Sequence, residues 1–127
     1  MSERAVYVYV AGPLSDMPAQ YLANVSNMSR VCRELAEDGY TPINPAGDML
    51  EGLMSGEAWP LSLYQGRSMN LLRLLAGRDD ACLYVFNDTH ADGRTSGGVA
   101  GEVDEAERLS IPTFITRYAM DRWRAGL

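Results

Sequence analysis

The chain has 127 residues, of which 46% are hydrophobic, and it carries a net charge of −6 at pH 7. This length predicts a single domain over residues 1–127 with one core. The acidic balance argues against a nucleic acid polymer as partner, because such a partner needs a basic face. No apolar run approaches the roughly 20 residues of a membrane span, and the N-terminus lacks the layout of a signal peptide. We therefore expect a cytoplasmic protein with no membrane partner.

All eleven basic residues are arginine. The lack of lysine excludes a side-chain Schiff base and the phosphate-binding lysine of a P-loop. His90 is the one histidine, which argues against a Ser-His-Asp triad and against a multi-histidine metal site. Cys32 and Cys82 lie in helix-like and strand-like patterns and are interpreted as reduced core residues. No metal or organic cofactor is expected.

The first half of the chain predicts two strands and one helix. Residues 5–12, "AVYVYVAG", are almost continuously apolar or aromatic, which is typical of a strand buried on both faces. Residues 18–38 carry apolar side chains at three- and four-residue spacing and end before Gly39, which predicts a helix. Residues 40–44 form a short second strand, and a long irregular connection follows them.

The second half continues the alternation. We expect helices at residues 60–76, 99–109 and 117–127 and strands at residues 80–87 and 111–116, with a polar, glycine-containing loop after residue 87. Strands that alternate with helices in one small domain predict an α/β fold. The expected architecture is a doubly wound parallel sheet of four to five strands in a three-layer α/β/α sandwich.

The strand order decides where a ligand would bind. If the first strand is central, with the second and third on either side of it, the chain reverses direction between the first and third strands. Open parallel sheets bind ligands at that point, outside the carboxyl ends of the strands. The loops after the first strand and after residue 87 would meet there.

The stretch "RTSGGVAGEVDEA", residues 94–106, follows the second of these loops. Ser96, Gly97 and Gly98 precede a helix, so its first amides could bind an anion; the alternative is a serine cap with flexible glycines. Glu102 is either a surface carboxylate that complements the helix dipole or a group in the crevice. Local pattern leaves both alternatives open.

Tyr9 lies near the end of the first strand, and a carboxylate at the switch point would be a suitable partner for its hydroxyl; core packing is the alternative. Arg94 could contact a phosphate or remain solvated. Other polar or aromatic residues are interpreted as structural or surface groups: Trp59, Asp79, Asp80 and His90.

Four segments together carry a resemblance to a known family. They are "VYVAGPLSDMP", "GYTPINPA", "DACLYV" and "SGGVAGEVDEA". In this combination the chain resembles the nucleoside 2-deoxyribosyltransferase-like superfamily. Within it the chain is most similar to small uncharacterised members and to the 2'-deoxynucleoside 5'-monophosphate N-glycosidases. The resemblance covers residues 6–115 and implies a flavodoxin-like, Rossmann-like fold.

The resemblance also implies roles for individual residues. Glu102 would be the catalytic carboxylate that attacks the anomeric carbon, and Tyr9 would hold it by a hydrogen bond. Ser96 would contact the 5'-phosphate of the substrate, and Gly12 would line the sugar and phosphate site. The implied activity is a cofactor-free nucleotide N-glycosidase or N-(deoxy)ribosyltransferase. Relatives often complete their active sites across a subunit interface, which implies a homodimer or larger homo-oligomer.

The sequence departs from the family in three places. Many relatives carry an aspartate on the second helix, where this chain offers Ser68 or Asn70 as the nearest polar residues. There is an apparent insertion around Gly77, and the loop over residues 87–95 is longer than expected.

The general acid therefore stays open among Asp16, Asp88, Asp92 and a residue of a neighbouring subunit. A nucleotide-binding or sensing module that has lost turnover is the second hypothesis. A third is a cytokinin-type phosphoribohydrolase, whose Gly-Gly-x-Gly-Thr-x-x-Glu loop "SGGVAGE" matches only in part, because the threonine is missing.

Overall fold

The computed structural model describes residues 4–14, 18–48, 54–56 and 59–127. Four strands form one parallel sheet in the order β2-β1-β3-β4. The strands are β1 (Tyr7–Ala11), β2 (Thr41–Ile43), β3 (Ala81–Val85) and β4 (Thr113–Phe114).

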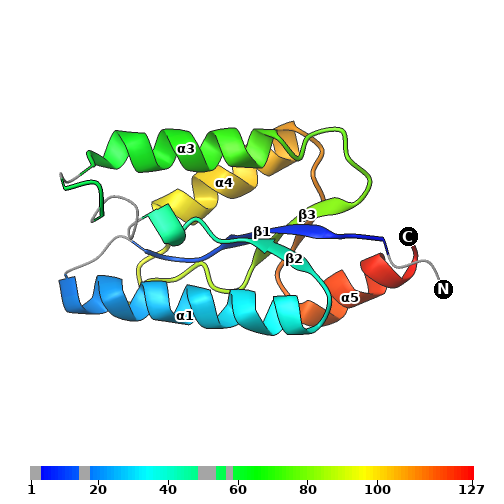
Figure 1. Cartoon of the computed structure of the whole chain (residues 1–127), viewed down its shortest axis with the longest axis horizontal. Coiled ribbons are helices and arrows are strands. Elements are labelled where there is room, and N and C mark those ends of the chain that lie inside the picture. Colours follow the sequence, from blue (N-terminus) through cyan, green and yellow to red (C-terminus); the bar gives the residue numbers. More distant parts are fainter. Residues whose placement is uncertain (1–3, 15–17, 49–53, 57–58) are drawn as a thin grey trace.

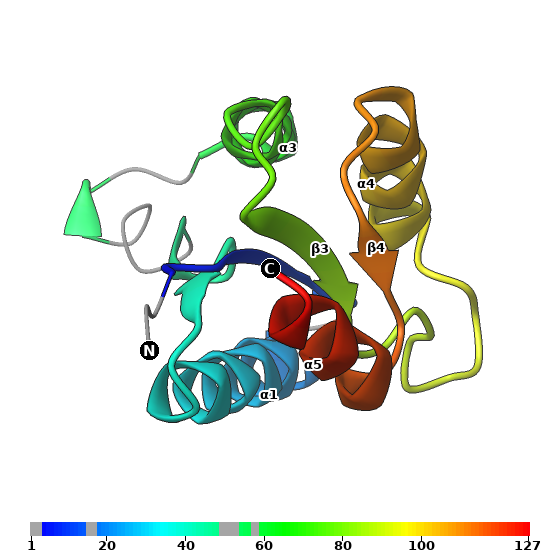
Figure 2. The same cartoon turned by 90° about the vertical axis from the view of Figure 1, so that its right-hand side faces the viewer.

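Helices cover both faces of this sheet. The described helices are α1 (Pro18–Glu37), α3 (Leu61–Arg73), α4 (Gly97–Arg108) and α5 (Arg117–Ala125). Helices α1 and α5 lie on one face and α3 and α4 on the other (Figures 1 and 2). The predicted flavodoxin/Rossmann-like, three-layer α/β/α fold is confirmed.

The central strand β1 is buried on both faces, as its continuous apolar run predicts. Val8 and Val10 belong to the core beneath α1 and α5, whereas Tyr9 and Ala11 belong to the core beneath α3 and α4. Successive side chains of a strand point to opposite faces, so a strand between two helical layers needs apolar residues at every position. Because β2 and β3 flank β1, the chain reverses direction between β1 and β3, and the predicted switch point is present.

The helices differ in detail from their predicted bounds. Helix α4 begins at Gly97, two residues earlier than predicted, because Ser96 caps it. Glu102 therefore lies in the second turn of α4 rather than the first. Cys32 and Cys82 are buried and free, as predicted. None of the described helices is long and apolar enough to cross a membrane.

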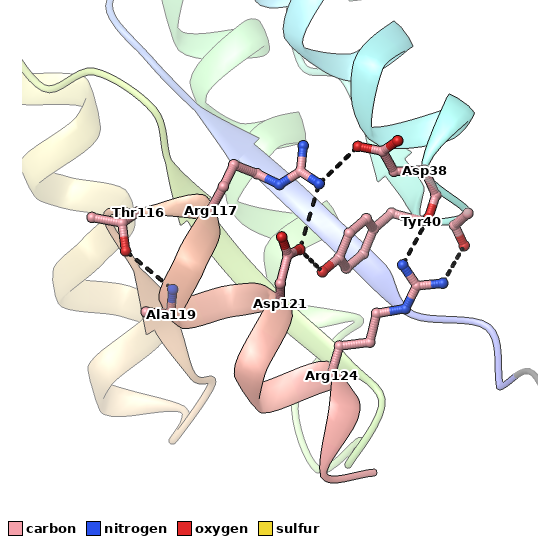
Figure 3. Close-up of polar contacts among 8 residues, drawn as sticks. Asp38, Tyr40, Thr116, Arg117, Ala119, Asp121 and Arg124 are labelled. Atoms are coloured by element: carbon pink, nitrogen blue, oxygen red, sulfur yellow. Dashed lines mark hydrogen bonds and ion pairs between the residues drawn. The ribbon is translucent and has the colours of Figure 1, made fainter.

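A polar cluster fixes the C-terminal helix to the turn between α1 and β2 (Figure 3). The Tyr40 hydroxyl donates a hydrogen bond to the Asp121 carboxylate at 2.5 Å, and Arg117 pairs with Asp38 at 2.9 Å. The Arg124 guanidinium donates to the carbonyl oxygen of Asp38 at 2.8 Å and lies 4.3 Å from the centroid of the Tyr40 ring. This cluster, which we call the α5 clamp, lies at the amino ends of the strands, away from the switch point.

Candidate active site

A cavity of about 1010 Å³ opens at the carboxyl ends of β1 and β2 and at the start of α4, the helix that follows β3, where the topology predicts a ligand site. Its walls come from the loop after β1, the segment after β2, helix α3 and the start of α4. Gly12, Gly98 and Glu102, all predicted as site residues, line it. The volume lies at the upper end of the range typical of small-molecule sites.

Glu102 projects into this cavity from α4. Burial raises the pKa of its carboxyl from 4.5 to about 7, because a charged carboxylate is poorly solvated there, and the nearby Tyr9 hydroxyl partly offsets the shift. A carboxylate that titrates near neutrality inside a cavity is suited to nucleophilic or acid–base chemistry. The sequence left open whether Glu102 is a surface carboxylate or a group in the crevice, and the structure favours the crevice.

Tyr9 lies in the middle of β1 with its side chain fully buried, and it does not line the cavity. Burial first, and then the charge of Glu102, raise the pKa of its hydroxyl far above the ordinary value, so this group stays a neutral donor. Glu102 raises and Ser68 lowers the pKa of this hydroxyl, but the hydroxyl makes no hydrogen bond of normal geometry to any described residue. The structure thus brings Tyr9 and Glu102 together without closing the hydrogen bond that the resemblance implies.

Two glycines let the backbone approach the cavity. A Cβ atom at Gly12 would collide with the ring of Phe86, so only glycine fits between this ring and the cavity. Gly98 and its neighbour Gly97 form the first turn of α4, whose amides have no partner within the helix. Such amides, at the positive end of the helix dipole, can bind an anion.

Ser96 and Arg94 are placed differently. Ser96 is buried, and its Oγ accepts a hydrogen bond from the backbone N–H of Val99 at 3.2 Å, which makes it the N-cap of α4. It is adjacent to the cavity rather than part of its lining. Arg94 is exposed, pairs with Asp92 at 2.6 Å and does not line the cavity.

The candidate general acids are not brought to the cavity in the described part of the chain. Asp88 and Asp92 are exposed on the loop before α4 and are absent from the cavity lining, and Asp16 lies outside the described residues. Ser68 and Asn70 do line the cavity from α3. They are the polar residues nearest to the position at which many members of the resembled family carry an aspartate.

An aromatic wall was not recognised from the sequence. Tyr21 of α1, Trp59 and Tyr64 of α3 line the cavity, and the rings of Trp59 and Tyr64 lie 5.3 Å apart between centroids. Trp59 was interpreted as a packing or surface residue, and instead it faces the site. Faces of such rings can stack on a nucleobase.

Two charged residues of the site were also missed. Asp48, which follows β2, is buried, lines the cavity and pairs with Arg67 of α3 at 3.4 Å. Arg73 lines the cavity from α3 and pairs with Glu105 at 3.4 Å. Asp48 could have been found by applying the carboxyl-end rule to the second strand as well as to the first and third.

No protein-family model matches the chain, and comparison with curated proteins and with solved structures gave no significant match. Within the described residues, no three histidine, cysteine or acidic side chains gather in a way that could hold a metal ion.

Proposed function

We propose that this chain is an N-glycosidase that cleaves the bond between base and sugar of a (deoxy)nucleoside 5'-monophosphate, or a related N-(deoxy)ribosyltransferase, with Glu102 as the nucleophile. The observation that carries the proposal is a carboxylate whose pKa is raised to about 7 inside a large cavity, beside a neutral tyrosine hydroxyl. Cleavage of an N-glycosidic bond passes through an oxocarbenium-like centre, which such a carboxylate can attack or stabilise.

The rest of the cavity supports a nucleotide as substrate. The aromatic wall, Tyr21, Trp59 and Tyr64, offers ring faces to a base. Gly97 and Gly98 offer helix-start amides to a phosphate, and Arg73 supplies a positive charge among the described lining residues. Ser96 is proposed as a further phosphate contact, since its hydroxyl hydrogen is not used by the bond it accepts from Val99. Arg94 would join it only if its loop moved toward the cavity.

A second candidate function is binding of a nucleotide without turnover. The observation in its favour is helix α3, which borders the cavity with Ser68 and Asn70 and carries no acidic residue. Tight binding of a monophosphate in calorimetry with no release of base would establish this function in place of the first.

We also propose a cytoplasmic homodimer or larger homo-oligomer. Two apolar side chains support this, Leu63 on α3 and Leu74 at its C-cap, because they are 54% and 73% exposed and border a hollow of about 570 Å³ beside Trp59. A second copy that covered this hollow would lie against the wall of the cavity.

The proposed activity is tested with a panel of nucleosides and their 5'-monophosphates, with free base measured by chromatography. Release of base from a monophosphate, and little from the matching nucleoside, is the expected result. Absence of base from every substrate would refute the proposal.

A further inference from the structure

Asp48 shares the cavity with Glu102. It lies just after β2, is 6% exposed and lines the cavity. A carboxylate is rarely so deeply buried without a charged partner, and Arg67 of α3 supplies one, with Nε 3.4 Å from a carboxylate oxygen of Asp48. The pairing with the guanidinium holds the carboxylate at the cavity, where its oxygens can accept a proton.

The sheet order places the two carboxylates on opposite sides of one tyrosine. Asp48 follows β2, Glu102 lies on the helix after β3, and β1 with Tyr9 runs between those strands. Both carboxylates act electrostatically on the Tyr9 hydroxyl. Their charges therefore converge on one region of the cavity, from its two flanks.

The described lining of the cavity contains two carboxylates. Among the described residues that line the cavity, Asp48 and Glu102 are the ones with acidic side chains. Helix α3 contributes Ser68 and Asn70 to the lining and carries no acidic residue.

From this arrangement we propose that Asp48, held by Arg67, is the second catalytic carboxylate and acts as the general base that activates water. The proposal rests on the proposed function. In the first step an oxygen of the Glu102 carboxylate bonds to the anomeric carbon, and the C–N bond breaks with its electron pair going to the base. In the second step Asp48 takes a proton from water while the water oxygen bonds to the anomeric carbon. The bond to Glu102 breaks, and its electron pair returns to the carboxylate. The anionic base takes a proton from solvent water as it leaves after the first step, and the proton on Asp48 passes to the hydroxide that this produces.

The test compares Asp48→Asn with the wild type in rapid-mixing assays of base release on the best monophosphate from the panel. Loss of a general base slows only the second step, so one equivalent of base per site is released in a burst. The steady-state rate then falls by about 10²- to 10⁴-fold. Azide, an anionic nucleophile that needs no base, restores turnover and yields the glycosyl azide. Asp104→Asn, an exposed carboxylate on α4, is the matched control and keeps the wild-type rate.

The outcomes separate this inference from the function on which it rests. If the wild type releases base and Asp48→Asn either keeps the full steady-state rate or loses the burst without azide rescue, Asp48 is not the general base. If the wild type releases no base, the proposed function fails, and the role of Asp48 fails with it. Should Asp48→Asn not fold, as judged by circular dichroism, Asp48→Ser leaves room for azide and gives the same two readouts.

Discussion

Glu102 is the residue at which stability and the proposed activity oppose each other. Burial raises the pKa of its carboxyl from 4.5 to about 7, so the folded protein binds this proton more tightly than the unfolded chain does. The free energy of unfolding therefore falls as pH rises from about 4.5 through about 7, and the loss is complete above that range.

Replacement of Glu102 by glutamine removes the buried charge. We expect Glu102→Gln to increase the free energy of unfolding at pH 8 by about 2 to 3 kcal/mol and to change it little at pH 4. Urea unfolding at the two pH values measures this difference. Equal stability of variant and wild type at pH 8 would mean that Glu102 is not buried as a charge.

Tyr9 tunes Glu102 through its hydroxyl, which lowers the pKa that burial raises. A nucleophilic carboxylate must be ionised, so kcat/KM of the wild type is expected to rise with pH through about 7. In Tyr9→Phe the inflection moves to higher pH, because the stabilising hydroxyl is gone. Tyr84→Phe, a buried tyrosine on the opposite face of the sheet, is the control and keeps the wild-type profile. Identical profiles for all three proteins would disprove the coupling.

At the scale of the element, the start of α4 combines a cap with the proposed phosphate site. Ser96 caps α4, and Thr116 caps α5 with the same geometry, each accepting from a backbone N–H at 3.2 Å. Ser96→Ala and Thr116→Ala should each lower the free energy of unfolding by about 1 kcal/mol. Only Ser96→Ala should also raise KM for the monophosphate. If both variants keep the wild-type KM, Ser96 is a cap and nothing more.

The α5 clamp joins the C-terminal helix to the turn before β2. Burial, and then the hydrogen bond to Asp121, raise the pKa of Tyr40 to about 12, so its hydroxyl remains a donor at any ordinary pH. Tyr40→Phe should lower the free energy of unfolding by about 1 kcal/mol. It should leave base release unchanged, because the clamp lies at the amino ends of the strands and the cavity lies at their carboxyl ends. Tyr118→Phe, on an exposed residue of α5, should cost much less. Loss of activity in Tyr40→Phe at unchanged stability would show that the clamp at the amino ends of the strands is coupled to the cavity at their carboxyl ends.

At the scale of the whole molecule, the sheet order assembles the cavity from distant parts of the chain. Strand type, strand order and the place of Gly12 beside the crevice could be predicted, because a buried parallel strand leaves a clear pattern. Local pattern left the place of Glu102 open, and only the family resemblance put it in the crevice. The place of Trp59 could not be predicted, because this residue belongs to a segment without apolar periodicity. That of Asp48 follows from the carboxyl-end rule only when the rule is extended to the second strand.

The first turn of α4 and the Tyr9 hydroxyl illustrate a second limit. Sequence pattern located this helix to within two residues, but whether Ser96 faces the helix or a ligand depends on side-chain rotation that spacing does not determine. Likewise, spacing could bring Tyr9 near Glu102 but could not fix a hydrogen bond between them.

The central claim is that Glu102 performs chemistry in the cavity, and a comparison of Glu102→Gln with the wild type tests it most directly. Both proteins are incubated with a panel of 5'-monophosphates, binding is measured by calorimetry, and free base is measured by chromatography. We expect the wild type to release base, and Glu102→Gln to bind the same monophosphate with release reduced by at least about 10³-fold. Equal release of base by the two proteins would contradict the account.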